Sequence, residues 1–239
     1  AKGDLSNARG LTRAKYRFNL SGGGILDLPA DPCQVLGQDK LGSILDIQPP
    51  EAGLFCEPSA PPSEDCRKPN LYEGPGDKAL KAAARKAVRG AGNTAERAER
   101  LRLFVHGHIS DKNYRSLYAT APEILATRSG DCTEHAVLLS ALLKAEGIPA
   151  RWVMGLVYTQ GAFWYHEWVE AYLEGERADH DHERPSGGWI SLDAVFPGAR
   201  LDATHIAVAR ACGEEDLLKA SAAVTGLLGK LSIEVLEAR

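Results

Sequence analysis

The first quarter of the chain contains short segments in which apolar and polar residues alternate, the pattern of a half-buried β-strand. Residues 16–20 and 25–28 show this pattern, and glycines and prolines separate them from their surroundings. Residues 58–75 are rich in Pro, Ser, Glu, Asp and Gly and contain few apolar residues, which is typical of a linker or a long surface loop. We therefore expect a β-rich lead-in with a Pro-rich linker over residues 1–72, followed by a larger unit over residues 73–239.

The larger unit begins with segments of helical periodicity. Residues 79–89 are rich in Ala and Lys, the segment from Thr94 carries apolar residues toward a core, and residues 121–127 predict a short third helix. A fourth helix is predicted after Cys132, because apolar residues recur there at helical spacing until Gly147. The Ser-Gly-Asp before it is turn chemistry, so we expect Cys132 at or near the N-terminus of its helix.

After this helix the period of the pattern changes to that of strands. The alternating segments are residues 150–157, 167–173 and 189–193. Gly-rich or charged loops separate them, which predicts an antiparallel sheet built from consecutive strands. His166 then falls at the start of a strand and Asp193 at the end of another. Residues 213–239 predict one or two closing helices, interrupted by glycines.

Composition and charge narrow the function classes. The chain has 44% hydrophobic and 25% charged residues, close to the average of soluble globular proteins. Its net charge of -4 arises from 28 basic and 32 acidic residues that are spread along the chain, so we expect no nucleic-acid partner. The longest apolar stretch, residues 136–158, is broken by charges and a proline, and we therefore expect no membrane-spanning helix in this chain.

The cysteines bear on the redox environment. They are Cys33, Cys56, Cys66, Cys132 and Cys212. If Cys132 is a reactive thiol, the other four allow three pairings. A disulfide between Cys56 and Cys66 would close a short Pro-rich loop and would favour an oxidising compartment. The alternative is that these cysteines are reduced, partly buried thiols, which would favour the cytosol.

Three residues of the larger unit carry the side chains of a nucleophilic cysteine site. A helix N-terminus stabilises a thiolate, so the predicted place of Cys132 is expected to lower its pKa. An imidazole can take up the thiol proton, and a carboxylate on its other ring nitrogen holds the ring in place. His166 and Asp193 lie on adjacent predicted strands and fit these roles, although Cys, His and Asp by themselves are a common set.

Four motifs surround these side chains. They are residues 128–136 (Arg-Ser-Gly-Asp-Cys-Thr-Glu-His-Ala), 147–151 (Gly-Ile-Pro-Ala-Arg), 165–170 (Tyr-His-Glu-Trp-Val-Glu) and 188–193 (Gly-Trp-Ile-Ser-Leu-Asp). In order, spacing and residue type they resemble the successive motifs of the bacterial transglutaminase-like superfamily. Two further segments, residues 112–114 (Lys-Asn-Tyr) and 202–206 (Asp-Ala-Thr-His-Ile), fit the same resemblance. The similarity extends over roughly residues 101–209 and does not include residues 1–70.

The resemblance implies an α+β fold of the papain-like kind, in which the nucleophile helix packs on an antiparallel sheet. It implies that Cys132 is the nucleophile, that His166 is its base and that Asp193 completes the triad. An amide or isopeptide carbonyl would be attacked to give a thioester, which is then released to water or to an amine. The main-chain N–H of Cys132 is expected to be one oxyanion donor. Tyr114 is a candidate for the second, and the alternative for it is a tyrosine of the core.

Other residues near the motifs have less specific roles. We expect Glu134 and His135 to support the nucleophile or to cap its helix, with His135 the one nearby rival of His166 as the base. Trp164 and Tyr165 flank His166 and are expected to line the acyl cleft.

Two histidine pairs raise the question of a metal site. His106 with His108 and His180 with His182 are spaced like neighbours on one face of a strand, and imidazole binds zinc. The second pair lies in a strongly charged loop typical of a solvated segment, and we find no acidic loop with the ligand spacing of a calcium site. We expect neither a metal nor a cofactor.

These patterns leave three functional hypotheses. The first is a cysteine-dependent peptidase or amidase with a peptide or protein substrate. The second is a protein-glutamine acyltransferase that cross-links proteins, because the sequence does not determine whether water or an amine takes the acyl group. The third is a catalytically inactive module that binds peptides. We expect a periplasmic or secreted location, with a cytoplasmic one as the alternative.

Overall fold

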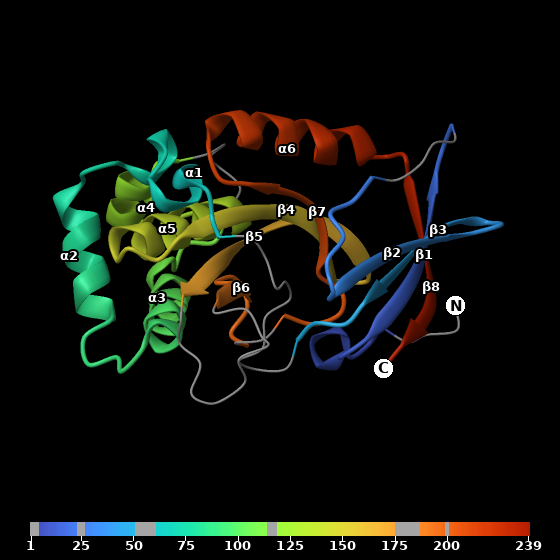
Figure 1. Cartoon of the computed structure of the whole chain (residues 1–239), viewed down its shortest axis with the longest axis horizontal. Coiled ribbons are helices and arrows are strands. Elements are labelled where there is room, and N and C mark those ends of the chain that lie inside the picture. The colour runs from blue at the N-terminus through green and yellow to red at the C-terminus, as the bar shows by residue number, and fades with distance from the viewer. Residues whose placement is uncertain (1–4, 23–26, 51–60, 114–118, 175–186, 199–200) are drawn as a thin grey trace.

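The computed structural model (Figure 1) describes residues 5–22, 27–50, 61–113, 119–174, 187–198 and 201–239. Helices α2 to α5 gather at the left of the view, a four-stranded sheet lies in the middle, and a second four-stranded sheet lies at the right. Helix α6 runs along the top. Helices packed against antiparallel sheets confirm the predicted α+β class.

The middle sheet has the strand order β6-β5-β4-β7, and its neighbours are antiparallel. Its strands are β4 (Ala150–Thr159), β5 (Ala162–Glu174), β6 (Gly187–Leu192) and β7 (Ile206–Ala211). The three predicted strands are present, but β5 begins earlier than expected, so that His166 lies inside it. Asp193 directly follows β6. The fourth strand, β7, is an addition that the periodicity did not reveal.

The early start of β5 follows from a tight turn. Gln160 and Gly161 both have positive φ angles, 51° and 84°, and Thr159 pairs with Ala162 on the other side of the turn. Two consecutive residues with positive φ are the signature of a two-residue hairpin whose twist matches that of the strands. The hairpin extends β4 and β5 beyond the buried part of the sheet.

The helical part follows the sequence closely. The helices are α1 (Glu64–Arg67), α2 (Lys78–Ala87), α3 (Thr94–His108), α4 (Ala121–Thr127), α5 (Cys132–Ala145) and α6 (Glu214–Leu227). Every residue of α5 from Glu134 to Lys144 is buried. A helix that is apolar on all sides belongs between other layers, and α5 packs on β4 and β5 with α2, α3 and α4 around it.

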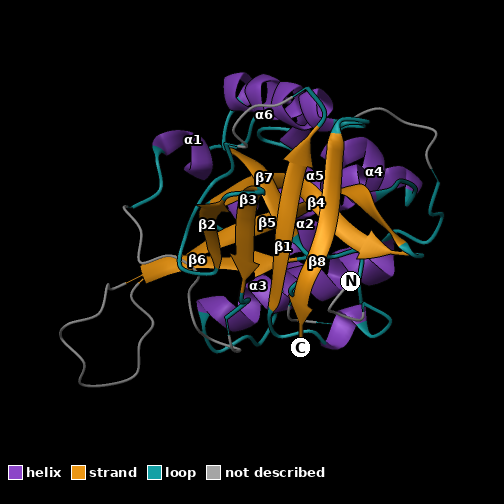
Figure 2. Cartoon of the chain, turned by 90° about the vertical axis from the view of Figure 1, so that its right-hand side faces the viewer, coloured by secondary structure: helices purple, strands orange, loops and turns teal. Residues whose placement is uncertain are grey.

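The right-hand sheet draws on both ends of the chain (Figure 2). Its order is β2-β3-β1-β8, with β1 (Ala14–Leu20), β2 (Gln34–Asp39), β3 (Gly42–Ile47) and β8 (Leu231–Ala238). The expectation of only helices in residues 213–239 is therefore wrong for the last part. Leu231, Ile233 and Val235 recur at every second position and pair with β1, which is strand periodicity.

The lead-in also differs from the prediction in its secondary structure. Residues 25–26 lie outside the described part of the chain, and residues 27 and 28 belong to no strand. Within residues 58–75, the described residues include α1 and a short 3₁₀ helix, Leu71–Glu73. Capping by Asn70 explains the latter, because its side chain accepts hydrogen bonds from the main-chain N–H groups of Tyr72 and Glu73.

The two sheets share one hydrophobic core and contact each other through polar groups. Gln34 of β2 donates to the carbonyl of Ala207 and accepts from its N–H, both at 2.8 Å. Buried Tyr16 of β1 donates to the carbonyl of Ala203 at 3.0 Å. The start of β7 and the segment before it are thereby held from the side of the N-terminal sheet. The proposed division at residue 72 remains a prediction, and both of its units contribute strands to this sheet.

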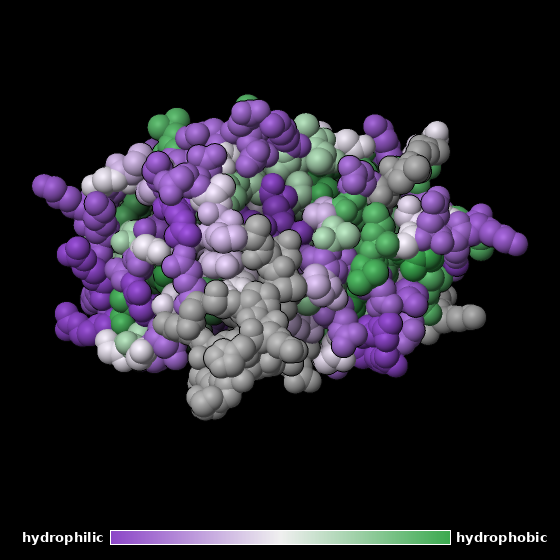
Figure 3. Space-filling view, viewed as in Figure 1, coloured by the Kyte–Doolittle hydropathy of each residue, from purple (hydrophilic) through white to green (hydrophobic). Residues whose placement is uncertain are grey.

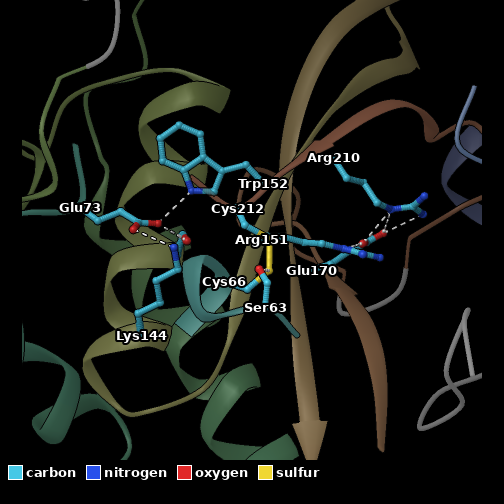
Figure 4. The surroundings of a disulfide bond; sticks show 10 residues. Ser63, Cys66, Glu73, Lys144, Arg151, Trp152, Glu170, Arg210 and Cys212 are labelled. Carbon is cyan, nitrogen blue, oxygen red and sulfur yellow. Dashed lines mark hydrogen bonds and ion pairs between the residues drawn. A yellow bond between two sulfur atoms is a disulfide. The ribbon is translucent and has the colours of Figure 1, made fainter. Parts of the chain in front are cut away.

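One disulfide joins distant parts of the sequence (Figure 4). It links Cys66 of α1 with Cys212, which directly follows β7, across 146 residues. The proposed pairing of Cys66 with Cys56 is therefore wrong, and Cys56 itself lies outside the described residues. The physical reason is that α1 packs on the middle sheet, which brings Cys66 beside Cys212. Cys33 and Cys132 are free.

Polar side chains cover most of the helical end of the molecule, and apolar side chains gather at the right of the view, over the N-terminal sheet (Figure 3). Within the described ranges, no helix is both long and apolar enough to cross a membrane.

Candidate active site

Helix α5 begins with a complete set of N-terminal caps. The side chain of Asp131 accepts a hydrogen bond from the N–H of Thr133 at 2.9 Å, and Glu134 accepts from the N–H of Asp131 at 2.9 Å. Gly130 precedes them with φ 149°, and a Cβ there would lie 2.3 Å from Glu134. A side chain at residue 130 would thus displace the cap. The turn and the caps place Cys132 at the first position of the helix.

The sulfur of Cys132 faces β5. It accepts a hydrogen bond from the main-chain N–H of Glu167, the residue that follows His166. Burial, followed by the negative charges of Asp131 and Glu167, raises the pKa of Cys132 to about 12. The expected lowering by the helix N-terminus is therefore outweighed, because removal from water disfavours the thiolate more than the helix end favours it. A thiol in this environment needs a base to take its proton.

His166 places an imidazole in the middle of β5. Its Nε2 lies 2.7 Å from Oδ2 of Asp193, and both side chains are buried. An imidazole whose Nε2–H donates to a carboxylate has its other nitrogen, Nδ1, available for a proton. Burial opposes the charge of Asp193, but the charge and the hydrogen bond of His166 dominate, and the pKa of Asp193 lies well below its usual range. Asp193 is thus a permanent anion beside His166.

The ladder of β5 and β6 explains how the two meet. Its last pair is Val169 with Leu192, so Asp193 leaves the sheet beside the segment that carries His166. Oδ1 of Asp193 accepts from the N–H of Val195 at 2.7 Å, which fixes the carboxylate in a tight turn. Trp168 stacks near His166, with ring centroids 6.1 Å apart.

Helix α3 holds the turn after Asp193 in place. Buried Arg102 donates to the carbonyls of Asp193 and Phe196, at 3.1 and 3.0 Å. His106 contributes Nδ1 to the carbonyl of Ala194 at 3.0 Å. These contacts connect the helical layer to the turn that carries Asp193.

Sequence reasoning assigned no role to His205, yet it is the second imidazole on the same carboxylate. Its Nε2 lies 3.1 Å from Oδ2 of Asp193. The segment that contains it resembled the known motifs, but nothing in its spacing showed that the turn before β7 reaches Asp193. The signal that could have found it is the Asp-Ala-Thr-His string itself, because a buried histidine requires partners.

The other candidate residues have varied places. Glu134 belongs to the helix cap. His135 is 1% exposed and donates Nδ1 to the carbonyl of Asp131 at 2.5 Å. Trp164 is 54% exposed, and Tyr165 donates its hydroxyl to the carboxylate of Glu167. Tyr114 lies outside the described residues.

The histidine pairs that raised the metal question are not arranged as expected. His106 and His108 lie in the last turn of α3, not on a strand, and each donates to a main-chain carbonyl, of Ala194 and of Leu125. His180 and His182 lie outside the described residues.

Another set of side chains has ligand atoms close enough for a metal ion, all within 4.8 Å of one another. It consists of His166, Asp193 and His205. Both imidazoles already contact the same carboxylate oxygen, so this arrangement fits hydrogen bonding without any ion.

Comparisons with known proteins place this geometry in context. Residues 81–194 match the model of the transglutaminase-like superfamily. No curated protein matches the sequence. A candidate cysteine protease of Cytophaga hutchinsonii has a similar solved structure, with a TM-score of 0.54 and 17% identity over 93% of this chain and 83% of that one. At this identity the likeness establishes a shared fold.

Two further solved structures are similar over smaller parts of their own length. The periplasmic domain of TgpA from Pseudomonas aeruginosa has a TM-score of 0.43 and 22% identity, over 64% of this chain and 53% of that one. Red sea bream transglutaminase has a TM-score of 0.39 and 10% identity, over 80% of this chain and 46% of that one.

Proposed function

We propose, on the premise that this chain carries a core of the transglutaminase-like superfamily over residues 81–194, that it is a cysteine-dependent hydrolase of amide or isopeptide bonds. The observation that carries the proposal is the buried pair of His166 and Asp193, 2.7 Å apart, together with a free cysteine at the start of α5 whose sulfur accepts from the N–H of the residue after His166. The substrate class is peptide or protein.

The chemistry assigns one role to each side chain. His166 takes the proton of the Cys132 thiol as the sulfur attacks the carbonyl carbon, and Asp193 stabilises the imidazolium that forms. The tetrahedral intermediate collapses when His166 gives this proton to the leaving nitrogen and the C–N bond breaks, which leaves a thioester on Cys132. Water then attacks the thioester, His166 accepts its proton and returns it to the sulfur, and the carboxylic acid is released.

The negative oxygen of both intermediates requires hydrogen-bond donors. The main-chain N–H of Cys132 is one of the first N–H groups of α5, and such groups have no partner within their helix. We assign it as one oxyanion donor. Tyr114 remains the proposal for the second.

The test of this function compares Cys132→Ala with wild type on a fluorogenic peptide library and on labelled casein. We expect turnover in wild type and none above background in the variant, because the nucleophile is lost. Cys33→Ala is the matched control, since Cys33 is the other free cysteine in the described ranges and lies outside the site. Retained turnover in Cys132→Ala would exclude Cys132 as the nucleophile.

The acyl acceptor is decided in the same assay by adding a fluorescent primary amine. Hydrolysis predicts release of fluorescent peptide without incorporation of the amine. Incorporation into casein that requires Cys132 would instead identify the cross-linking activity. Binding of peptide without turnover of either kind would identify an inactive, peptide-binding relative.

The disulfide supports an extracytoplasmic location. Disulfides persist in oxidising compartments and are rare in the cytosol. Cys66 and Cys212 form such a bond. We expect that alkylation of intact cells before lysis labels Cys33 and leaves Cys66 and Cys212 unmodified. Labelling of Cys66 and Cys212 as well would place the chain in a reducing compartment.

A further inference from the structure

Asp193 contacts more than the base it orients. Its Oδ2 accepts from Nε2 of His166 at 2.7 Å and from Nε2 of His205 at 3.1 Å, while Oδ1 is occupied by the N–H of Val195. All three ionisable side chains are buried. The carboxylate therefore has two imidazole partners. One is the proposed base, His166 of β5, and the other is His205, which precedes β7.

His205 has a second carboxylate on its other side. Its Nδ1 lies 3.3 Å from Oδ2 of Asp202, in an ion pair. Asp202 is fixed by hydrogen bonds from Thr204, whose N–H and hydroxyl donate to Oδ1 at 2.8 and 2.5 Å. His205 Nδ1 has no hydrogen-bond partner in the described part of the chain, so Asp202 acts on the ring through its charge. An imidazole that lies between two carboxylates is favoured in its doubly protonated, positively charged form.

The electrostatics agree with this protonation. Burial alone would lower the pKa of His205, but the hydrogen bond to Asp193 and the charges of Asp202 and Asp193 outweigh it and raise the pKa above the ordinary value. The faces of the ring are covered by Trp168 and Phe196, with ring centroids at 5.5 and 5.9 Å. His166 is the other titratable group beside it, with ring centroids 5.8 Å apart.

The N-terminal segment adds a further charged group beside Asp202. Arg9 pairs with Oδ2 of Asp202 at 2.8 Å and donates to the hydroxyl of Thr204 at 3.0 Å. Its guanidinium also lies over the ring of Phe196, 4.4 Å from the centroid, and that ring is 5.5 Å from His166. Positive and negative groups thus alternate from Arg9 through Asp202, His205 and Asp193 to His166.

We propose that His205 is a positioning residue of the site, an imidazolium that fixes Asp193 and shares its negative charge with His166, and that Asp202 and Arg9 hold it there. This proposal rests on the proposed function, since it concerns the same base. It assigns to the N-terminal segment a part in a site whose other residues come from α5, β5 and the turns beside β6 and β7.

The charge balance gives the expected effect. With His205 protonated, Asp193 is partly neutralised and stabilises the imidazolium form of His166 less. Without that cation, the full charge of Asp193 acts on His166, and the base stays protonated, and therefore inactive, up to a higher pH. A residue that only supports the fold would change the amount of folded protein and leave the pH profile in place.

The test uses His205→Gln, which keeps a donor for Asp193 but carries no charge. We expect the acid limb of kcat/KM to move to higher pH by about half a unit or more. At pH 6 we expect kcat to fall by about threefold, with KM little changed, because the reacting groups and not the substrate contacts are affected. His108→Gln is the matched control, since His108 donates to the carbonyl of Leu125 in α4. Its profile should coincide with that of wild type.

Arg9→Gln tests whether the charged group farthest from His166 contributes to the pH profile. We expect a shift in the same direction and of smaller size, because Arg9 reaches His205 only through Asp202. Arg9→Lys should shift the profile less than Arg9→Gln does, because lysine keeps a positive charge near Asp202 but loses the stacking on Phe196. A profile of His205→Gln that superimposes on that of wild type would overturn the proposal.

A measurement that needs no turnover distinguishes a failure of this proposal from a failure of the proposed function. Nitrogen-15 spectra of the histidine rings in Cys132→Ala should show both nitrogens of His205 protonated at pH 7.5. A neutral ring there would overturn the proposal even if the enzyme is active. Loss of the proposed function would appear differently, as wild-type turnover that does not depend on Cys132.

Discussion

The residues around the candidate site differ in how burial affects their charge. Asp193 and Asp202 are buried as anions because His205 and Arg9 offset their charge and because His166 donates a hydrogen bond to Asp193. His135 is the contrasting case. Burial lowers its pKa to about 4, and the hydrogen bond to the carbonyl of Asp131 offsets only part of this effect. It is therefore a neutral ring within the nucleophile helix, and its location beside charged groups does not make it a second base.

His135 predicts an acid sensitivity with a definite sign. Between pH 6.5 and about 4 the unfolded chain binds a proton at His135 and the folded chain does not, so stability falls as pH falls through this window. The loss amounts to at most about 3 kcal/mol at pH 4. His135→Gln should flatten the dependence of the free energy of unfolding on pH, measured by urea denaturation. An unchanged slope would show that His135 protonates in the folded protein.

His205 predicts the opposite slope. Its folded pKa is raised, so its contribution to stability is complete below pH 6.5 and is lost as pH rises through the folded value. The double variant His135→Gln, His205→Gln should lose both effects. In one pH series of denaturation curves, the dependence of the free energy of unfolding on pH should flatten below pH 6.5 through His135 and above it through His205. A change on the acid side alone would contradict the raised pKa of His205.

At the scale of elements, β4 and β7 approach each other closely at Gly155. This residue pairs with His166 on one side and with Ala207 on the other, next to an irregularity in the β4–β7 ladder. A Cβ there would lie 2.1 Å from the carbonyl oxygen of Ile206 and 2.8 Å from the ring of Trp168. The glycine thus sets the distance between the strand of the base and the turn that carries His205.

Gly155→Ala should accordingly damage both stability and activity. We expect a loss of about 2–3 kcal/mol in the free energy of unfolding, since the backbone must shift to admit the methyl group. Gly226→Ala is the matched control, because Gly226 lies inside α6 with nothing near the added atom. There we expect a gain of up to about 1 kcal/mol. Equal effects of the two variants, measured by urea denaturation, would contradict the packing described at Gly155.

The sequence predicted elements best where one period dominates. The turn residues before Cys132 and the apolar run to Ala145 predicted α5, and alternation predicted the buried half of β5. The end of the chain was less readable. The helix signal of α6 and the glycines after it masked the short alternation of β8, whose partner β1 is more than 200 residues away in the chain. A strand at a sheet edge takes its identity from such a partner as much as from its own residues.

In the site, too, some residues could be predicted from the sequence and others could not. The motifs around Cys132, His166 and Asp193 were recognisable because each has a local signature of turn, cap or strand. His205 was not, since its role depends on a turn whose position is set by Gln34 and Tyr16 from the other sheet. The raised pKa of Cys132 likewise follows from burial, which sequence spacing does not report.

At the scale of the whole molecule, the disulfide and the N-terminal sheet connect distant segments. Cys66 and Cys212 join α1 to the end of β7, and the bond closes a loop of 146 residues. Buried Glu73 follows a few residues after α1 and accepts from Lys144 and Trp152 (Figure 4). Together they fasten the lead-in to α5 and to the middle sheet.

The double variant Cys66→Ser and Cys212→Ser should be markedly less stable. Closing a loop of this length restricts the unfolded chain by an amount worth about 4–5 kcal/mol, an upper value. Reductant should lower the melting temperature of wild type toward that of the variant and leave the variant unchanged. Cys33→Ser should behave like wild type, since Cys33 forms no disulfide. A wild type that is insensitive to reductant under unfolding conditions would contradict the bond.

The measurement that tests the central claim most directly is the rate of Cys132 alkylation as a function of pH, in wild type and in His166→Ala. The account predicts that wild type gains reactivity between about pH 5 and 8, the range in which an imidazole titrates. In the variant, burial keeps the thiol protonated, and reactivity should rise only well above the ordinary cysteine value of about 8.5. Superimposable profiles, or a wild type that titrates like free cysteine, would contradict a working pair of Cys132 and His166.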